Sequence, residues 1–165
     1  YGIEPAVIAG DMDSISQEMK QRYSDRLLFD GADQESNDLT KAVKHCIESG
    51  IDDAVILGAT GLREDHTIGN ISLRAEYSEV INVKMVTDRG IFVPLQSGSR
   101  ISTWPGQQVS LFSNNPELEI SSEGLRYPLR KLKLTNWWRG SLNESSADTI
   151  SLTFEGGQVI VYLAF

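Results

Sequence analysis

The stretch DAVILGATGLREDHTIGN, residues 53–70, decides the fold that we predict. Its first five residues are mostly apolar and predict a short strand, and the apolar spacing over residues 64–79 predicts a long helix. Gly58 and Gly61 mark the turn between the two. A strand that leads through a short turn into a helix is the repeating unit of α/β proteins.

The first 95 residues repeat this alternation of strand and helix. Further short apolar runs and helical patterns occupy residues 5–10, 15–23, 26–29, 37–49 and 81–87. Strands that alternate with helices predict right-handed crossovers and a mainly parallel sheet. We therefore predict an α/β domain with a mainly parallel sheet over residues 1–95.

The pattern changes after residue 96. Six short segments, often with alternating polar and apolar residues, are separated by Gly, Pro, Asn or Ser; they span residues 101–104, 107–112, 118–122, 131–135, 149–154 and 158–163. This pattern is typical of an antiparallel sandwich or barrel. We place the boundary near residues 96–98 and predict an all-β sandwich domain over residues 96–165.

Composition limits the functions that we consider. Of the 165 residues, 40% are hydrophobic, which is enough for a real core. The formal net charge of −8 argues against general nucleic-acid binding, although not against a nucleotide substrate. We expect neither a membrane span nor a secretory leader. The single cysteine, Cys46, excludes an internal disulfide and favours a cytoplasmic location.

Two carboxylates follow the first predicted strand. GDMDS, residues 10–14, places Asp11 and Asp13 two positions apart, so that in an extended segment both side chains point the same way. In open α/β sheets, ligands bind at the carboxyl ends of the strands. Paired carboxylates suit Mg²⁺, which combines a few of them with phosphate oxygens and water. The same spacing also occurs in many surface turns.

A second polar block, DQESNDLTKAV, carries Gln34, Asp38 and Lys41. Ser36 or Asn37 can cap the helix that follows, and Asp38 then lies in its first turn, where the helix dipole favours a carboxylate. This structural interpretation competes with a functional one, in which Asp38 and Lys41 hold metal and phosphate together. Gln34 precedes both in a loop.

The third polar block is the glycine turn itself. Gly58 and Gly61 let backbone N–H groups approach a phosphate at a helix N-terminus, although no G-K-[ST] sequence follows, so this is not a Walker A loop. Arg63 offers a fork of donors to phosphate, but a surface pair with Asp65 explains both residues without a ligand. His66 is either a base or ligand, or a partly buried helix residue.

All three polar blocks lie between a predicted strand and a predicted helix. In a parallel sheet these strand ends fall on one edge. The sequence therefore predicts a Mg-nucleotide site built from acidic residues together with Lys41 and Arg63.

These blocks resemble the motifs of thiamine pyrophosphokinases. GDMDS resembles the family's G-D-x-D-S, and DQESNDLTKAV is similar to its D-Q-x-x-[ST]-D-x-x-K block. GATGLREDH is similar to G-x-x-G-R-x-D-H, with Leu62 inserted before Arg63. In the second half, EGLRYPL and RGSLNE resemble G-L-x-[YW]-x-L and G-[ST]-S-N-E, with Leu142 in place of a small serine. The family's A-D-G-G-A segment is absent, so we expect a chain that is incomplete at its N-terminus.

The resemblance implies an activity, an architecture and a set of site residues. It implies a catalytic α/β domain that binds Mg²⁺ and ATP, a β-sandwich that binds thiamine, and a homodimer with thiamine between the subunits. Diphosphate would pass from ATP to the thiamine hydroxyl, which gives thiamine diphosphate and AMP. By motif, the residues would be Asp11, Asp13 and Asp38 for Mg²⁺ and phosphates; Gln34 and Lys41 for the nucleotide phosphates; Arg63 and Asp65 beside thiamine and diphosphate; and Ser141 and Asn143 in the thiamine pocket. Asp13 or Asp65 would accept the hydroxyl proton.

Other interpretations of the sequence stay open. A related diphosphokinase that acts on a pterin-like alcohol would share the first half, and a thiamine- or nucleotide-binding sensor would bind without turnover. Trp137 and Trp138 would face opposite ways on a strand. One of them could stack on a cationic thiamine ring, or both could serve sheet packing or a dimer contact.

Overall fold

The computed structural model describes residues 3–29, 36–73, 77 and 80–165. The chain divides into two compact units, Tyr1–Asp52 (unit 1) and Asp53–Phe165 (unit 2).

In its described residues, unit 1 contains a short parallel strand pair and two helices. Strand β1 (Ile8–Gly10) pairs with β2 (Leu27–Phe29), with Ile8 opposite Leu27. Helix α1 (Gln17–Arg22) lies between the two strands in the chain.

Both helices of unit 1 begin at side-chain caps. Ser16 Oγ accepts a hydrogen bond from the N–H of Met19 at 3.3 Å at the start of α1. Helix α2 (Asp38–Glu48) is capped by Asn37, whose Oδ1 accepts from the N–H of Thr40 at 2.8 Å. The cap satisfies one of the N–H groups that a helix start leaves without an intrahelical partner. It also places Asp38 in the first turn of α2, as the sequence predicts.

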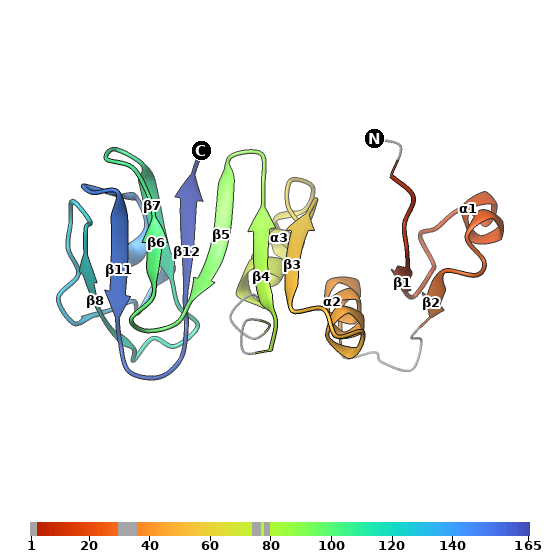
Figure 1. Cartoon of the computed structure of the whole chain (residues 1–165), viewed down its shortest axis with the longest axis horizontal. Coiled ribbons are helices and arrows are strands. Elements are labelled where there is room, and N and C mark those ends of the chain that lie inside the picture. The colour runs from red at the N-terminus through yellow and green to blue at the C-terminus, as the bar shows by residue number, and fades with distance from the viewer. Residues whose placement is uncertain (1–2, 30–35, 74–76, 78–79) are drawn as a thin grey trace. The chain divides into compact units, whose positions relative to one another are not determined.

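The described residues of unit 2 form two β-sheets. The larger sheet has the order β10-β7-β12-β5-β4-β3. Its strands are β3 (Asp53–Leu57), β4 (Asn82–Val86), β5 (Gly90–Leu95), β7 (Gln108–Phe112), β10 (Asn143–Glu144) and β12 (Val159–Ala164). The smaller sheet has the order β6-β11-β8-β9. Its strands are β6 (Arg100–Ser102), β8 (Glu119–Glu123), β9 (Leu132–Lys133) and β11 (Thr149–Thr153). In Figure 1, β12 runs between β5 and β7 in the larger sheet.

The prediction of a mainly parallel sheet is wrong. In the described part of the chain, parallel pairing joins β1 to β2 and β3 to β4, whereas β5 runs antiparallel to β4. The physical reason is the connection between β4 and β5. A parallel return needs a crossover of a dozen or more residues, but the N–H of Thr87 already donates to the carbonyl of Gly90 at 2.9 Å across a tight turn. The described structure is accordingly mostly strand, with few helices.

A shared apolar core lies between the two sheets of unit 2. In β12, alternate residues take part in different clusters: Val159, Val161 and Leu163 belong to this core, whereas Ile160 belongs to a second cluster on the other face. The core includes fully buried residues from both sheets, namely Val109, Leu111, Ile120, Ile150 and Leu152. Full burial of each such side chain contributes about 1.5–3 kcal/mol. This core joins the two sheets of unit 2 face to face. The all-β sandwich domain over residues 96–165 stays a prediction, because the larger sheet also takes β3, β4 and β5.

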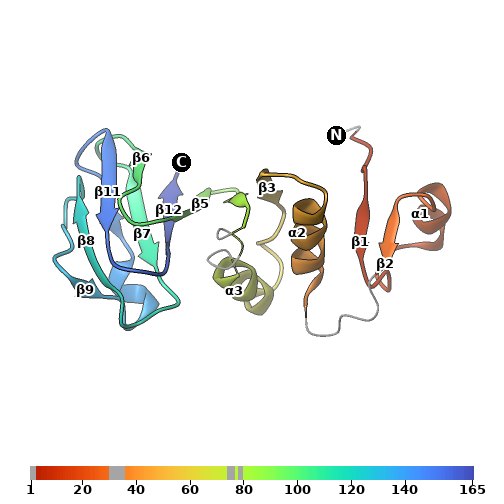
Figure 2. The same cartoon turned by 60° about the horizontal axis from the view of Figure 1, so that its bottom comes forward.

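Helix α3 (Glu64–Ser72) covers the other face of the larger sheet. Ile71 packs there against the cluster of Met85, Phe92 and Ile160. Both views show the helix beside β3 and β4 (Figure 1, Figure 2). The described helix is shorter than predicted; residues 74–76 and 78–79 lie outside the described part.

Trp137 and Trp138 lie on a short 3₁₀ helix, η1 (Trp137–Gly140), and not on the strand that their spacing suggested. The Trp137 ring packs edge-on against Phe112, with ring centroids 5.8 Å apart. Trp138 is 73% exposed. One tryptophan therefore supports the sheet, and the other is accessible from solvent.

The predicted boundary near residue 96 falls between β5 and β6, which belong to different sheets. The larger sheet takes strands from both sides of that point, so a division into domains there stays a prediction. Within the described ranges, no helix has the length and apolar character needed to cross a membrane.

Gly140 provides a test of the packing between η1 and β7. A Cβ atom at this position would overlap the carbonyl oxygen of Leu111. We expect Gly140→Ala to lower the free energy of unfolding by at least about 2 kcal/mol, within the range for overpacked sites. Gly69→Ala is the matched control, because a Cβ at that helical position meets nothing within 4 Å. The control should be neutral or stabilising by up to about 1 kcal/mol. Urea denaturation measures both, and equal stabilities would contradict the packing.

Candidate functional site

The site residues predicted from the sequence are divided between the two units. Unit 1 carries Asp11, Asp13, Asp38 and Lys41. Unit 2 carries Arg63, Asp65, Ser141 and Asn143. Gln34 lies outside the described residues.

Asp11 and Asp13 form a close acidic pair directly after β1. The N–H of Asp13 donates to Oδ1 of Asp11 at 3.2 Å. Met12 between them has φ = +63°, in the left-handed region that non-glycine residues rarely adopt. The two carboxyl groups therefore meet through a sharp turn, and not through the extended segment that we predicted.

The pair shifts the two pKa values in opposite directions. The backbone and side-chain hydrogen bonds from Asp13, with a contribution from the positive charge of Lys41, lower the pKa of Asp11. The side-chain hydrogen bond to Asp11 and its negative charge, with a contribution from Asp38, raise the pKa of Asp13. One carboxyl group thus ionises before the other. A cation bound by both carboxylates would offset the repulsion between them, which separates their two pKa values.

Gly10 makes room for Asp38 beside this pair. A Cβ atom on Gly10 would lie only 3.1 Å from Cγ and from Oδ1 of Asp38. The φ of Gly10, +148°, is also one that side chains rarely adopt. The glycine before the acidic pair therefore lets the first residue of α2 approach the end of β1. This role of Gly10 is not apparent from the sequence, although the glycine stands in the GDMDS motif.

Lys41 follows Asp38 by three residues on α2 and is only 8% exposed. Its charge acts on Asp11. A buried ammonium requires negative partners, because desolvation of an isolated charge is costly. The carboxylates of unit 1 and Lys41 together can hold a ligand that carries both a cation and negative oxygens.

The acidic residues of unit 1 fit a metal that is shared with a phosphate. In the described part of the chain, no three His, Cys, Asp or Glu side chains are gathered as a metal site. Mg²⁺, however, is usually held by one or two carboxylates together with substrate phosphates and water. Asp11 and Asp13 supply such a pair, and Gly10 leaves the adjoining space to Asp38.

Arg63 and Asp65 form a bidentate ion pair at the start of α3. Arg63 Nε donates to Oδ1 of Asp65 at 3.0 Å, and Nη2 donates to Oδ2 at 2.5 Å. The pair raises the pKa of Arg63 and lowers that of Asp65. Both side chains are more than half exposed, so solvent screens the pair, which contributes little to stability and can exchange partners readily. This is the surface pair that the sequence allowed as an alternative, and an oxyanion could replace Asp65 on the Arg63 fork.

A cavity of about 320 Å³ lies between the glycine turn and α3, with Gly58, Arg63 and His66 in its lining. His66 is exposed, and not partly buried as one sequence interpretation had it. Leu62, also in the lining, is 96% exposed. The cavity thus combines an exposed imidazole and an apolar side chain with the Arg63 guanidinium.

Asn143 uses its amide to join two segments of unit 2. Its Oδ1 accepts from the N–H of Tyr127 at 3.1 Å and of Glu144 at 2.8 Å, and its Nδ2 donates to the carbonyl of Tyr127 at 2.8 Å. The residue is 8% exposed. Its side chain therefore takes the place of a strand partner for Tyr127.

Ser141 lies two residues before Asn143, and its hydroxyl donates to the carbonyl of Trp138 at 2.7 Å. Leu142 between them is strongly exposed and has φ = +58°. Tyr127 and Trp138 are exposed as well. The two segments that Asn143 and Ser141 organise thus present three apolar side chains to solvent, a feature that sequence patterns alone did not reveal.

The opposed pKa shifts of the acidic pair can be tested by substitution. We expect Asp11→Asn to lower the pKa of Asp13, because it removes the negative charge that makes ionisation of Asp13 unfavourable. An NMR pH titration of the carboxyl carbon of Asp13 measures the change, with Asp88→Asn as a control. An unchanged Asp13 midpoint would contradict the pairing.

The bonds of Asn143 predict a graded loss of stability. Asn143→Ala removes three hydrogen bonds and should lower the free energy of unfolding by about 2–4 kcal/mol. Asn143→Asp keeps the two acceptor bonds and, at a pH low enough to protonate its carboxyl group, can still donate to the Tyr127 carbonyl, so under that condition it should lose less. Asn136→Ala, at an exposed position whose side chain makes no cap hydrogen bond, is the control and should change little. Thermal denaturation of all three variants decides the order.

Two family models match the chain. The model described as "Thiamin pyrophosphokinase, catalytic domain" matches residues 1–85. The model described as "Thiamin pyrophosphokinase, substrate-binding domain" matches residues 90–162. The join between the two matches falls at the turn from β4 to β5.

Curated relatives match over shorter stretches. Thiamine pyrophosphokinase 1 of Oryza sativa subsp. japonica is 35% identical over 99 residues, which cover 54% of this chain and 38% of that protein. Thiamine pyrophosphokinase 3 of the same organism is 38% identical over 79 residues, which cover 42% of this chain and 30% of that protein. The matches thus span well under two thirds of the length of these relatives.

Solved structures share the fold. A thiamine pyrophosphokinase from Bacillus subtilis has a TM-score of 0.77 at 22% identity, covering 99% of this chain and 80% of that one. A thiamin pyrophosphokinase from Candida albicans has a TM-score of 0.75 at 20% identity, covering 99% of this chain and 74% of that one. With family models that span both halves, the chain belongs to the thiamin pyrophosphokinase family.

Proposed function

We propose that the protein transfers diphosphate from ATP to the hydroxyl of thiamine and releases AMP. The observation that carries this proposal is the arrangement after β1, where Gly10 admits Asp38 beside the Asp11 and Asp13 pair and Lys41 acts on it. These residues lie within the region that matches the catalytic-domain model. They combine carboxylates for a metal with a buried cation for phosphate.

The transfer needs alignment and charge neutralisation more than covalent chemistry. The thiamine hydroxyl would attack the β-phosphorus of ATP while AMP leaves. Mg²⁺ held by Asp11, Asp13 and Asp38 would supply charge neutralisation on the phosphates. Lys41 would offset charge that develops on the transferred oxygens, and Arg63 would do so after exchanging Asp65 for a phosphate oxygen.

A carboxylate is the proposed acceptor of the hydroxyl proton. Asp13 is one candidate, because its raised pKa makes it the better proton acceptor of the pair. Asp65 is the other candidate, although its pairing with Arg63 lowers its pKa and weakens it as a base. Gln34 keeps its proposed role as a contact to the nucleotide phosphates.

The second half is the proposed thiamine-binding part, within a homodimer. Its support is the match to the substrate-binding model and the exposed Tyr127, Trp138 and Leu142 on the segments that Ser141 and Asn143 organise. Exposed aromatic side chains are favoured where an amphipathic ring or another protein surface binds. We propose the cytoplasm as the location, supported by the single free cysteine.

Substitution of Asp13 tests the proposed reaction. Asp13→Asn should lower thiamine-dependent AMP release from Mg-ATP by at least about 10²-fold, since positioning and charge neutralisation supply most of the catalysis. Asp88→Asn, an exposed aspartate in the turn before β5, is the matched control and should retain full activity. Wild-type activity in Asp13→Asn would exclude the metal role of this residue.

The same assay separates the alternatives. Thiamine binding by the wild-type protein without AMP release would favour the sensor. AMP release that depends on a hydroxymethyl pterin in place of thiamine would favour the related diphosphokinase. Either result would overturn the proposed substrate or activity.

A further inference from the structure

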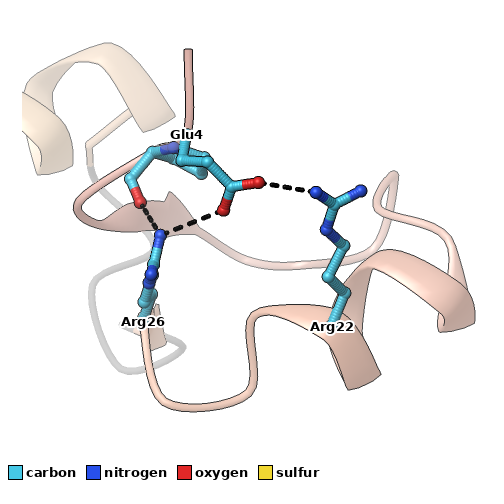
Figure 3. A network of polar contacts seen from close by, with 4 residues as sticks. Glu4, Arg22 and Arg26 are labelled. Atoms are coloured by element: carbon cyan, nitrogen blue, oxygen red, sulfur yellow. Dashed lines mark hydrogen bonds and ion pairs between the residues drawn. The ribbon is translucent and has the colours of Figure 1, made fainter. Parts of the chain in front are cut away.

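A three-residue ionic cluster lies at the other end of the segment that leads into the acidic pair. Figure 3 shows the Glu4 carboxylate facing the guanidinium groups of Arg22 and Arg26. Arg22 Nη2 donates to Oε1 of Glu4 at 2.6 Å, and Arg26 Nη1 is 3.4 Å from Oε2. Arg26 Nη1 also donates to the carbonyl of Pro5 at 2.7 Å. The cluster therefore ties the chain before β1 to α1 and to the residue before β2.

Both guanidinium groups, of Arg22 and Arg26, lie over the ring of Tyr23. Its ring centroid lies 5.1 Å from Cζ of Arg22 and 5.6 Å from Cζ of Arg26, within the range of cation–π attraction. Its side chain is buried, and its carbonyl accepts from the N–H of Arg26 at 2.9 Å. This ring keeps the two guanidinium groups together, so that one carboxylate can engage both.

The strand pair beyond this cluster is too short to set its own register firmly. Strands β1 and β2 pair over three residues only, in parallel. Such two-stranded pairs are marginal alone, and parallel pairing is slightly less stable per residue than antiparallel pairing. Slippage by one residue would move β1 by about 3.3 Å and turn its side chains to the other face. Gly10 and the acidic pair would move with it.

Arg26 bonds to the β1 segment at two points. Its guanidinium holds the carbonyl of Pro5, and its own carbonyl accepts from the N–H of Ile8 at 2.8 Å. Two contacts three residues apart on the same segment leave one register that satisfies both. The Glu4 carboxylate adds a third contact on the same side.

We propose that Arg26, together with Glu4, is a positioning residue that sets the register of β1 and thereby holds Asp11 and Asp13 next to Asp38. The inference rests on the proposed function, because it takes the acidic pair as the site for Mg-ATP. In this proposal Arg26 acts through the backbone of β1 and not by contact with substrate. Its effect should be confined to the nucleotide half of the reaction.

The decisive experiment compares Arg26→Gln with Lys20→Gln. The second substitution also removes one positive charge, but from α1. Arg26→Gln should raise the KM for Mg-ATP by at least about fivefold and leave the KM for thiamine within twofold, since displacement of a binding group by ~1 Å is enough to cost up to ~10²-fold. Lys20→Gln should change neither value. Arg26→Lys, which keeps the charge toward Glu4, should restore part of the Mg-ATP affinity.

Simple unfolding predicts a different result. A smaller folded fraction would lower the apparent kcat and leave both KM values unchanged, and that outcome would overturn the proposal. Equal increases in the KM for Mg-ATP and for thiamine would overturn it too. The double variant Glu4→Gln with Arg26→Gln should raise the KM for Mg-ATP by less than the product of the two single effects, because the two residues act on the same segment.

Hydrogen exchange separates this proposal from the proposed function. The amide of Ile8, which donates to Arg26, should exchange at least about tenfold faster in Arg26→Gln than in Lys20→Gln, because its protection depends on the local opening of this contact. If the wild-type protein releases no AMP with thiamine, the proposed function fails, and the Ile8 exchange rate alone decides the register role. Equal exchange in the two variants overturns that role.

Discussion

Pairing between β12 and β5 holds unit 2 together, because it joins the end of the chain to a strand near its middle. The two strands pair over six residues, from Val159 opposite Leu95 to Ala164 opposite Gly90. Alternate residues of β12 then enter two different apolar clusters, one between the sheets and one under α3. Long-range pairing of this kind becomes favourable only when the apolar faces are buried at the same time. The packing between the two sheets and the packing of α3 on the larger sheet therefore both depend on β12.

The backbone conformations of Gly10 and Met12 set the geometry of the candidate site more than the acidic side chains do. Two carboxylates repel, and each exposed one is better solvated alone. Met12 in the left-handed region brings Asp11 and Asp13 together, and Gly10 lets Asp38 approach. Backbone strain at functional sites is sustained by the surrounding structure. In unit 1 that surrounding structure includes the contacts of Arg26 to the segment before β1.

The hydrogen bonds and ion pairs of the motif residues differ in strength. The exposed pair of Arg63 and Asp65 is weak and can open toward an oxyanion. Asn143, in contrast, is buried, and each of its bonds to Tyr127 leaves an unpaired backbone group when broken. A motif residue can thus bind a ligand directly, or it can hold the segments that bind the ligand in place. Burial of the side chain distinguishes the two roles, and a sequence motif carries no information on burial.

The sequence by itself determined the short strands, the capped helix at Asp38, the strand-rich character of the second half and the acidic pair in GDMDS, because each follows from local spacing and chemistry. Tertiary structure decided the rest. Antiparallel return of β5 on β4 depends on a tight turn, and the 3₁₀ helix at Trp137 depends on packing against Phe112. Tyr127 lies 16 residues from Asn143 in the chain, and Glu4 lies 22 residues from Arg26. Contacts at that separation form only when the chain folds, so no local pattern can encode them.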